Sequence, residues 1–152
     1  MKIQIENKQT KIKIQRHIIR RTVRTLLNIL DCANKELSIS FVDDKTIQQL
    51  NKNYLQRDHS TNVLSFSLQE GEYGNINPDI LGDIIISAET AQRDAAIGDL
   101  SLSEEIDFLI IHGLLHLLGF NHENTTKARK TKMQIKEREL FGMLNSGKSK
   151  TI

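Results

Sequence analysis

Three of the five histidines stand within eleven residues, in the segment from His112 to His122. If this segment is helical, His112 and His116 lie about one turn apart and place their imidazoles on the same face. Two neutral imidazoles at this spacing can bind one metal ion, with zinc at about 2.0–2.1 Å from each nitrogen. Gly119 can end the helix and turn the chain back, so that His122 reaches the same ion. Three protein ligands leave one coordination position for water, which is typical of a catalytic zinc site.

A histidine pair on an apolar helix can also be a satisfied part of the core. The third histidine after a glycine turn favours the metal site, because burying three imidazoles without a partner would cost roughly several kcal/mol. The pattern differs from the metalloprotease motif, in which a glutamate follows the first histidine as general base. Gly113 occupies that position in this chain. The segment therefore does not indicate peptide hydrolysis by that route.

Two further segments carry residue patterns of comparable length. LNKNYLQRDHSTNVLSF spans residues 50–66, and LGDIIIS spans residues 81–87. Together with HGLLHLLGFNH at residues 112–122, they resemble the motifs LNxxYRxxDxPTDVLSF, LGDIxIS and HGxLHLxGYDH of the YbeY family of bacterial rRNA maturation factors and endoribonucleases. The resemblance covers about residues 45–123.

The resemblance implies an α/β fold, in which a small, mostly parallel four-stranded sheet packs with about five helices and the histidine helix is central. It implies one Zn²⁺ per chain, held by His112, His116 and His122. It also implies a zinc-dependent, single-strand-specific endoribonuclease that acts in rRNA processing, in 3′-end maturation of the small ribosomal subunit and in ribosome quality control. The expected partners are ribosomal RNA and the small subunit, with no DNA and no membrane, and we expect a monomer.

The chain departs from the family motifs at positions that bear on catalysis. Leu55 stands where the family has an arginine that is thought to face the zinc site, and Asn121 replaces an aspartate before the last histidine. Arg57 lies two residues further on and could supply the missing cation, because a guanidinium can contact a phosphate bidentately. Zinc lowers the pKa of bound water to about 7 and can polarise a phosphoryl oxygen. We therefore expect Arg57 and the ligand His116 to be the catalytic residues.

Other side chains are weaker candidates for the cleft. Ser65, Asp83 and Thr61 lie in the motif segments and could shape the cleft or brace the ligands, or be ordinary strand and turn residues. His59 could donate a proton, although a histidine in a loop is more often simply exposed. Glu123 could act as a base or begin the final helix, where its charge suits the helix dipole.

Hydrophobic periodicity predicts the elements that position these residues. Strands are expected at about 3–5, 37–41, 64–68 and 81–86. Helices are expected at about 13–31, 43–54, 87–96, 101–118 and 124–144, with a loop at 71–78. The helix that carries the histidines is nearly all apolar, so we place it in the core. Interleaved strands and helices predict one layered α/β domain.

The composition fits this domain. The chain has 152 residues, of which 38% are hydrophobic and 26% are charged, as in one globular domain. We expect residues 1–147 to form the domain and residues 148–152 to be a flexible tail. No apolar run reaches the roughly 18 residues of a membrane span, and the N-terminus lacks the apolar run of a secretory signal. Cys32 is the only cysteine, which excludes an internal disulfide. We therefore expect a cytoplasmic protein.

Charge is distributed unevenly along the chain. Residues 1–24 contain eight Lys or Arg and one acidic residue. Residues 36–107 contain four Lys or Arg and fourteen acidic residues, and residues 123–152 contain eight Lys or Arg and three acidic residues. The two basic ends could bind a polyanion, or they could simply be solvated helix faces. For RNA, the expected contacts are Arg16, Arg20, Arg24, Lys127, Arg129, Lys130 and Lys132.

Two other functions stay open. The chain could be a noncatalytic ribosome-assembly factor whose metal is structural, and Leu55 favours this alternative. It could also be another metal-dependent hydrolase, acting on a small molecule or a peptide, although Gly113 disfavours the peptide. RNA cleavage by the zinc-loaded protein, beside a His116→Ala control, would separate these alternatives.

Overall fold

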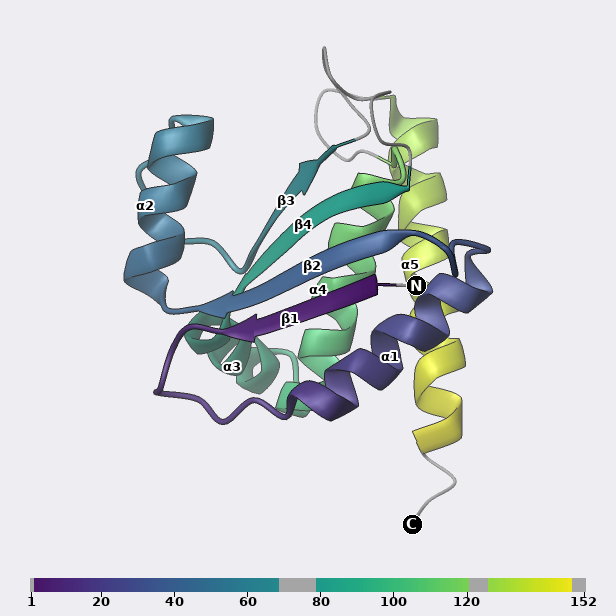
Figure 1. The fold of residues 1–152 in the computed structure, drawn as a ribbon, viewed down its shortest axis with the longest axis horizontal. Helices are drawn as coiled ribbons and strands as arrows, with labels where there is room; N and C mark the ends of the chain where they lie inside the picture. The colour runs from purple at the N-terminus through teal and green to yellow at the C-terminus, as the bar shows by residue number, and fades with distance from the viewer. Residues whose placement is uncertain (1, 69–78, 121–125, 149–152) are drawn as a thin grey trace.

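Four strands of the described chain form one sheet. The computed structural model describes residues 2–68, 79–120 and 126–148. The sheet order is β1-β2-β4-β3 (Figure 1), with β1 at Lys2–Asn7, β2 at Glu36–Val42, β4 at Ile80–Ser87 and β3 at Val63–Ser67. β1 pairs with β2 and β2 pairs with β4 in parallel, whereas β3 pairs with β4 antiparallel. The expected small, mostly parallel sheet is therefore confirmed, and β3 forms an edge of it.

Side chains alternate between the two faces of this sheet, as the strand period requires. One row across the sheet aligns Ile5, Ile39, Ile84 and Ser65. The three isoleucines of this row are buried in the main core, so they mark the inner face. The next row holds Gln4, Ser38, Asp83 and Phe66, and it faces the other way.

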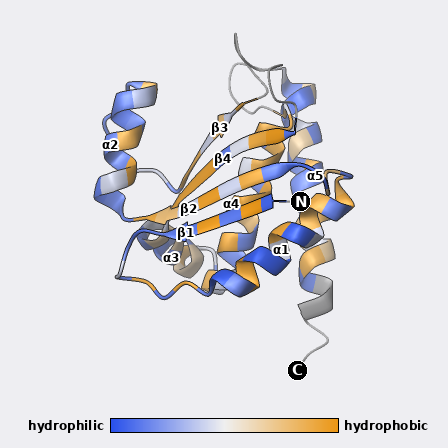
Figure 2. Cartoon of the chain, viewed as in Figure 1, coloured by the Kyte–Doolittle hydropathy of each residue, from blue (hydrophilic) through white to orange (hydrophobic). Residues whose placement is uncertain are grey.

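Five helices of the described chain surround the sheet. They are α1 at Arg16–Ile29, α2 at Asp44–Leu55, α3 at Ala88–Ile97, α4 at Leu102–Leu117 and α5 at Lys127–Lys148. α4 lies behind the sheet in Figure 1, and α5 packs beside it. α2 covers part of the outer face near β3 and β4, where Ile47 packs with Val42 and Leu64. Figure 2 shows that α1 and α2 mix hydrophilic and hydrophobic residues, as helices with one exposed side do.

α4 occupies the core, as its composition predicts. Ten of its residues are buried, from Glu105 to Leu117. Its N-terminus has the predicted capping box, in which Ser101 and Glu104 satisfy each other's backbone N–H groups. Gly113 lets the helix approach the sheet, because an added Cβ there would lie 3.1–3.2 Å from side-chain carbons of Ile84.

Two helix limits differ from the prediction. α1 begins at Arg16 rather than at about Lys13, because the buried Gln9 side chain organises the preceding turn. Gln9 accepts from the N–H groups of Lys11 and Ile12 and donates to the Ile12 carbonyl. α5 extends to Lys148 rather than ending near residue 144. The predicted loop at 71–78, the expected helix start at 124 and tail residues 149–152 lie outside the described residues, and no described helix is long and apolar enough to cross a membrane.

Candidate active site

The two histidines of α4 face each other at close range. Nε2 of His112 lies 3.1 Å from Nε2 of His116, and the two ring planes are inclined at 73°. Two nitrogens that bind one tetrahedral zinc ion at about 2.0–2.1 Å lie about 3.3 Å apart. The donor type, the facing Nε2 atoms and their spacing therefore fit a shared zinc ion.

His112 is held by aromatic and acidic neighbours. Phe108, one turn earlier on α4, stacks on its ring at 6.4 Å between centroids. Glu137 lies on α5, and its Oε2 atom is 3.2 Å from Nδ1 of His112. Glu137 is only 4% exposed. Glu137 is not among the residues predicted from the sequence, although one signal is present. It interrupts an apolar stripe that Met133 and Leu140 continue at helical spacing.

A pocket of about 410 Å³ opens beside the histidines. Three parts of the chain line it, namely the C-terminal half of α4 with the turn after it, the edge strand β3, and the end of α2 with the segment that follows. The side chains relevant to chemistry include Arg57, His59, Thr61, Ser65, His112 and His116. Arg57, His59, Thr61 and Ser65, predicted from the sequence to be at the cleft, are thus brought to the same cavity as the two histidines.

The end of α2 directs its following residues to this pocket. Gln56 adopts a left-handed conformation with φ of 56°, which ends the helix after Leu55. The backbone N–H of Arg57 donates to the Asn51 carbonyl, and Asn51 Nδ2 donates to the His59 carbonyl at 3.0 Å. Leu55 and Arg57 therefore line the same pocket from either side of this bend.

The comparisons with known proteins show the family of the chain. The sequence model of one protein family, Endoribonuclease YbeY, matches residues 4–145. The chain belongs to this family. It is 55% identical to "Endoribonuclease YbeY" of Syntrophus aciditrophicus (strain SB) over 145 residues, which cover 95% of this chain and 91% of the relative. It is 40% identical to "Endoribonuclease YbeY" of Geobacter sulfurreducens over 147 residues, which cover 97% and 98%.

A solved structure supports the fold independently. The solution structure of TM1509 from Thermotoga maritima matches with a TM-score of 0.62 and 21% identity, over 99% of this chain and 96% of that one. At 21% identity, this match shows only that the two chains share a fold. The expected α/β fold of the YbeY family is confirmed.

Two residues of the YbeY motif LGDIxIS lie away from the histidines. Asp83 is exposed on the outer face of the sheet, in the row opposite to that of Ile84, so it neither lines the histidine pocket nor braces the ligands. Of the two alternatives left open for Asp83, the structure therefore supports the ordinary strand residue. A shift of one residue along a strand reverses the face, and the sequence alone did not settle it.

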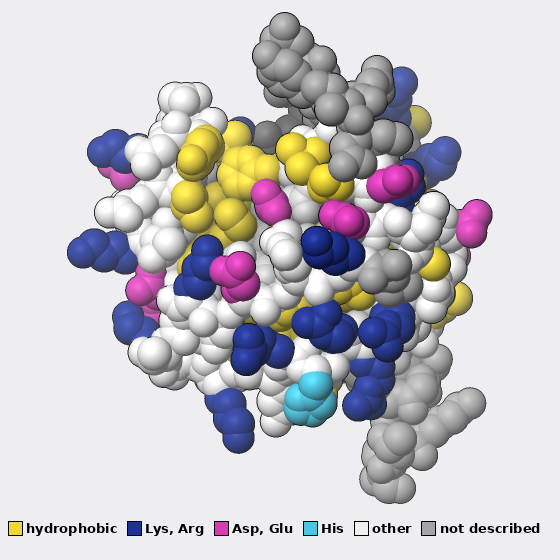
Figure 3. Space-filling model, viewed as in Figure 1, with side chains coloured by type: hydrophobic (Ala, Val, Ile, Leu, Met, Phe, Trp, Pro, Cys, Tyr) yellow, Lys and Arg dark blue, Asp and Glu magenta, His cyan; other side chains and the backbone are white. Residues whose placement is uncertain are grey.

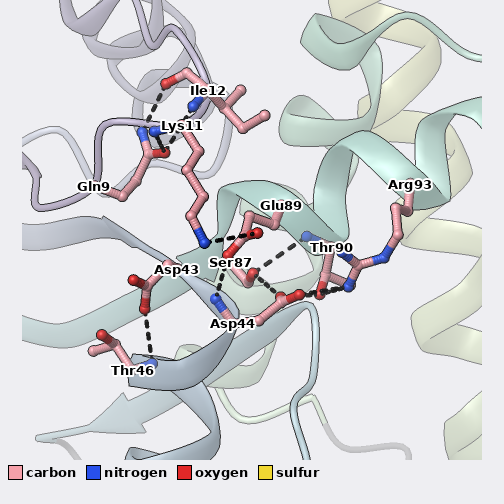
Figure 4. Close-up of polar contacts among 10 residues, drawn as sticks. All are labelled: Gln9, Lys11, Ile12, Asp43, Asp44, Thr46, Ser87, Glu89, Thr90 and Arg93. Carbon is pink, nitrogen blue, oxygen red and sulfur yellow. Dashed lines mark hydrogen bonds and ion pairs between the residues drawn. The ribbon is translucent and has the colours of Figure 1, made fainter.

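Ser87, the last residue of that motif, belongs to a clasp between α2 and α3 (Figure 4). Its hydroxyl donates to Asp44 at 2.6 Å, and Thr90 and Arg93 donate to the same carboxylate. Burial alone would raise the pKa of Asp44, but these hydrogen bonds outweigh burial and hold the pKa below its usual value of 3.8. Glu89 completes the clasp by accepting from the Asp44 backbone N–H. The clasp fixes the start of α2, whose end lines the pocket.

Part of the predicted site lies outside the described residues. His122, the expected third zinc ligand, falls there together with Asn121 and Glu123. Within the described ranges, no group of three or more His, Cys, Asp or Glu side chains gathers as a metal site. Of the three expected ligands, the structure therefore describes His112 and His116.

Proposed function

We propose that this chain is a zinc-dependent, single-strand-specific endoribonuclease that acts in rRNA processing, including 3′-end maturation of the small ribosomal subunit and ribosome quality control. The observation that carries the proposal is the facing pair of Nε2 atoms, 3.1 Å apart, beside a pocket that also receives Arg57. The YbeY relatives, which are named endoribonucleases, support RNA as the substrate class. In this proposal the protein works as a cytoplasmic monomer.

The metal site is part of the proposal. His112, His116 and His122 would hold one Zn²⁺ per chain, and zinc supplies Lewis-acid chemistry that activates water and polarises a phosphoryl oxygen. The Nε2 atoms of the described pair are imidazole nitrogens at the right separation for such an ion.

Arg57 would act on the phosphate itself. Its guanidinium can form two parallel hydrogen bonds to phosphoryl oxygens and stabilise the charge that develops there. The pocket is bounded by the edge strand β3 and by the bend after α2, so an RNA strand would have to be splayed to place one phosphate in it. Single-stranded RNA can adopt this form, whereas a duplex is recognised mainly by its shape.

Cleavage of defined RNAs by zinc-loaded protein tests the proposal. We expect cleavage of a single-stranded RNA that carries the small-subunit 3′ precursor, little cleavage of a duplex, and loss of both zinc and activity in His116→Ala. Metal analysis of protein purified without chelator should give one zinc per wild-type chain. Equal metal content in wild type and His116→Ala would exclude the ligand assignment.

A noncatalytic assembly factor is the second candidate, favoured by one observation. The Leu55 side chain, 43% exposed, lines the pocket where the family motif has arginine. In this case zinc-loaded protein would bind small-subunit precursors without cutting them, and His116→Ala would leave cleavage at the same background level as wild type. A peptide-cleaving enzyme is disfavoured, because Gly113 stands where metalloproteases carry the glutamate that acts as general base.

A further inference from the structure

Glu137 is a carboxylate almost removed from solvent. It is 4% exposed and lies on the inner face of α5 between Met133 and Leu140, both of which are fully buried. Burial of a carboxylate is costly unless charged or hydrogen-bonding groups compensate for it. The free-energy cost of burying the Glu137 carboxylate therefore indicates that its contact with α4 has a specific function.

The contact is made with one end of the His112 ring. Glu137 Oε2 lies 3.2 Å from Nδ1, while Nε2 at the other end faces His116. An ionised carboxylate can only accept hydrogen bonds, so it favours the imidazole form with the proton on Nδ1. In that form the lone pair lies on Nε2, which is the atom directed at the proposed metal position.

Aromatic packing fixes the same ring in a second way. Phe108 stacks on His112 with planes inclined at only 25°, and Phe141 of α5 contacts Phe108 edge-on at 6.2 Å. The pairs Phe108–Phe141 and His112–Glu137 show that α4 and α5 run antiparallel in contact along this stretch. α5 thus contributes both the carboxylate and part of the aromatic support of a ligand on α4.

We propose that Glu137 is a positioning residue that orients His112 for metal binding and selects its Nδ1-protonated tautomer. The proposal rests on the proposed zinc site. Carboxylates that hydrogen-bond a ligating histidine typically change metal affinity by about 10–100-fold when they are removed. A purely structural glutamate would instead change stability and leave the affinity of the folded protein for zinc unaltered.

Zinc affinity, measured on the full chain by competition with a chromophoric chelator, provides the test. We expect Glu137→Ala to weaken zinc binding by about 10–100-fold and Glu137→Gln, which keeps an acceptor and the volume, to weaken it less. Glu139→Gln is the matched control, because Glu139 lies on the same helix, is 55% exposed and pairs with Lys136. Thermal unfolding of the metal-free proteins shows whether each variant is folded.

A second measurement does not require metal. Nitrogen-15 spectra of the histidine rings in metal-free protein report which nitrogen carries the proton. We expect the Nδ1-protonated form for His112 in wild type and Glu139→Gln, and a shift away from it in Glu137→Ala, which lacks the acceptor. Wild-type zinc affinity in both Glu137 variants, or an unchanged tautomer in Glu137→Ala, would overturn the role of Glu137. If wild type itself binds no zinc, the metal site of the proposed function fails, whereas the tautomer of His112 still decides whether Glu137 orients the ring.

Discussion

At the scale of single residues, two side chains at the end of α2 line the pocket, the apolar Leu55 and the cationic Arg57. Leu55 ends α2, and Arg57 follows after the left-handed Gln56. An apolar side chain cannot donate to a phosphate oxygen and desolvates the group it faces, whereas a guanidinium can donate through two N–H groups. We therefore expect Arg57, rather than the residue at position 55, to stabilise the negative charge that develops on the phosphoryl group.

Replacing Arg57 by alanine is expected to slow single-turnover RNA cleavage by about thirty-fold to a thousand-fold, equivalent to about 2–4 kcal/mol of transition-state stabilisation. Leu55→Arg, which restores the residue type of the family motif, should increase the rate. Lys52→Ala is the matched control, because Lys52 is an exposed cation on α2 that lies near Asp58. Unchanged cleavage by Arg57→Ala would exclude this role. A large gain in Leu55→Arg would identify a weakened nuclease and favour the assembly-factor alternative.

The residues of the site differed in how far the sequence could predict them. His112 and His116 could be paired from the sequence, because a spacing of four residues on one helix is a local relation. Glu137 could not be assigned to His112, because 25 residues separate them and only the packing of α5 on α4 brings them together. Asp83 lies in a family motif, but the strand register places its side chain on the outer face of the sheet, away from the histidine pocket.

At the scale of elements, β3, β4 and α4 approach each other closely at Gly82. Its φ is +146°, which side-chain-bearing residues rarely adopt. A Cβ added there would lie 2.1 Å from the Phe66 carbonyl oxygen on β3 and 3.1 Å from a Leu117 methyl on α4. The position therefore lets the edge strand that lines the pocket pair with β4 beneath the end of the histidine helix.

Gly82→Ala is accordingly expected to lower the free energy of unfolding by about 2–4 kcal/mol, through backbone strain and overpacking. Gly142→Ala is the matched control, since Gly142 is exposed within α5 and an added Cβ there meets nothing within 4 Å. That control should stabilise the protein by up to about 1 kcal/mol, because alanine favours helix. Urea unfolding followed by circular dichroism measures both. Equal stability of Gly82→Ala and wild type would contradict the close approach.

The elements themselves were largely predictable because they depend on local patterns. Alternation predicted strands that the structure places within a few residues, and Ser101 with Glu104 predicted the start of α4. The start of α1 was not predictable, because it depends on a turn closed by the Gln9 side chain. The polar appearance of α5 concealed a buried stripe, since only Met133, Glu137 and Leu140 of that helix are fully or almost fully buried among its described side chains.

At the scale of the whole molecule, the two basic ends of the chain occupy different places. The first turns of α1 and the start of α4, at Leu102 and Ile106, line one small pocket. The histidines lie roughly 15 Å further along α4. Figure 3 shows Lys and Arg side chains gathered where Figure 1 places α1. α5 runs antiparallel to α4, so its basic first turns lie towards the histidine end. Arg20 is also engaged in the fold, because it donates to the Ile3 carbonyl on β1.

This arrangement predicts that the two basic groups contribute unequally to RNA binding. Reversing the charges of Lys127, Arg129 and Lys130 on α5 should weaken binding more than reversing Arg16 and Arg24 on α1, because the α5 group lies nearer to the proposed cleavage site. Each lost phosphate contact should reduce the slope of log affinity against log salt by about 0.7 for single-stranded RNA. Fluorescence anisotropy of labelled RNA at several salt concentrations measures both quantities, and zinc content should stay constant in both variants. Equal losses of RNA affinity in the two variants would indicate that the RNA contacts α1 as well. RNA binding that does not depend on salt would contradict an electrostatic contribution to binding.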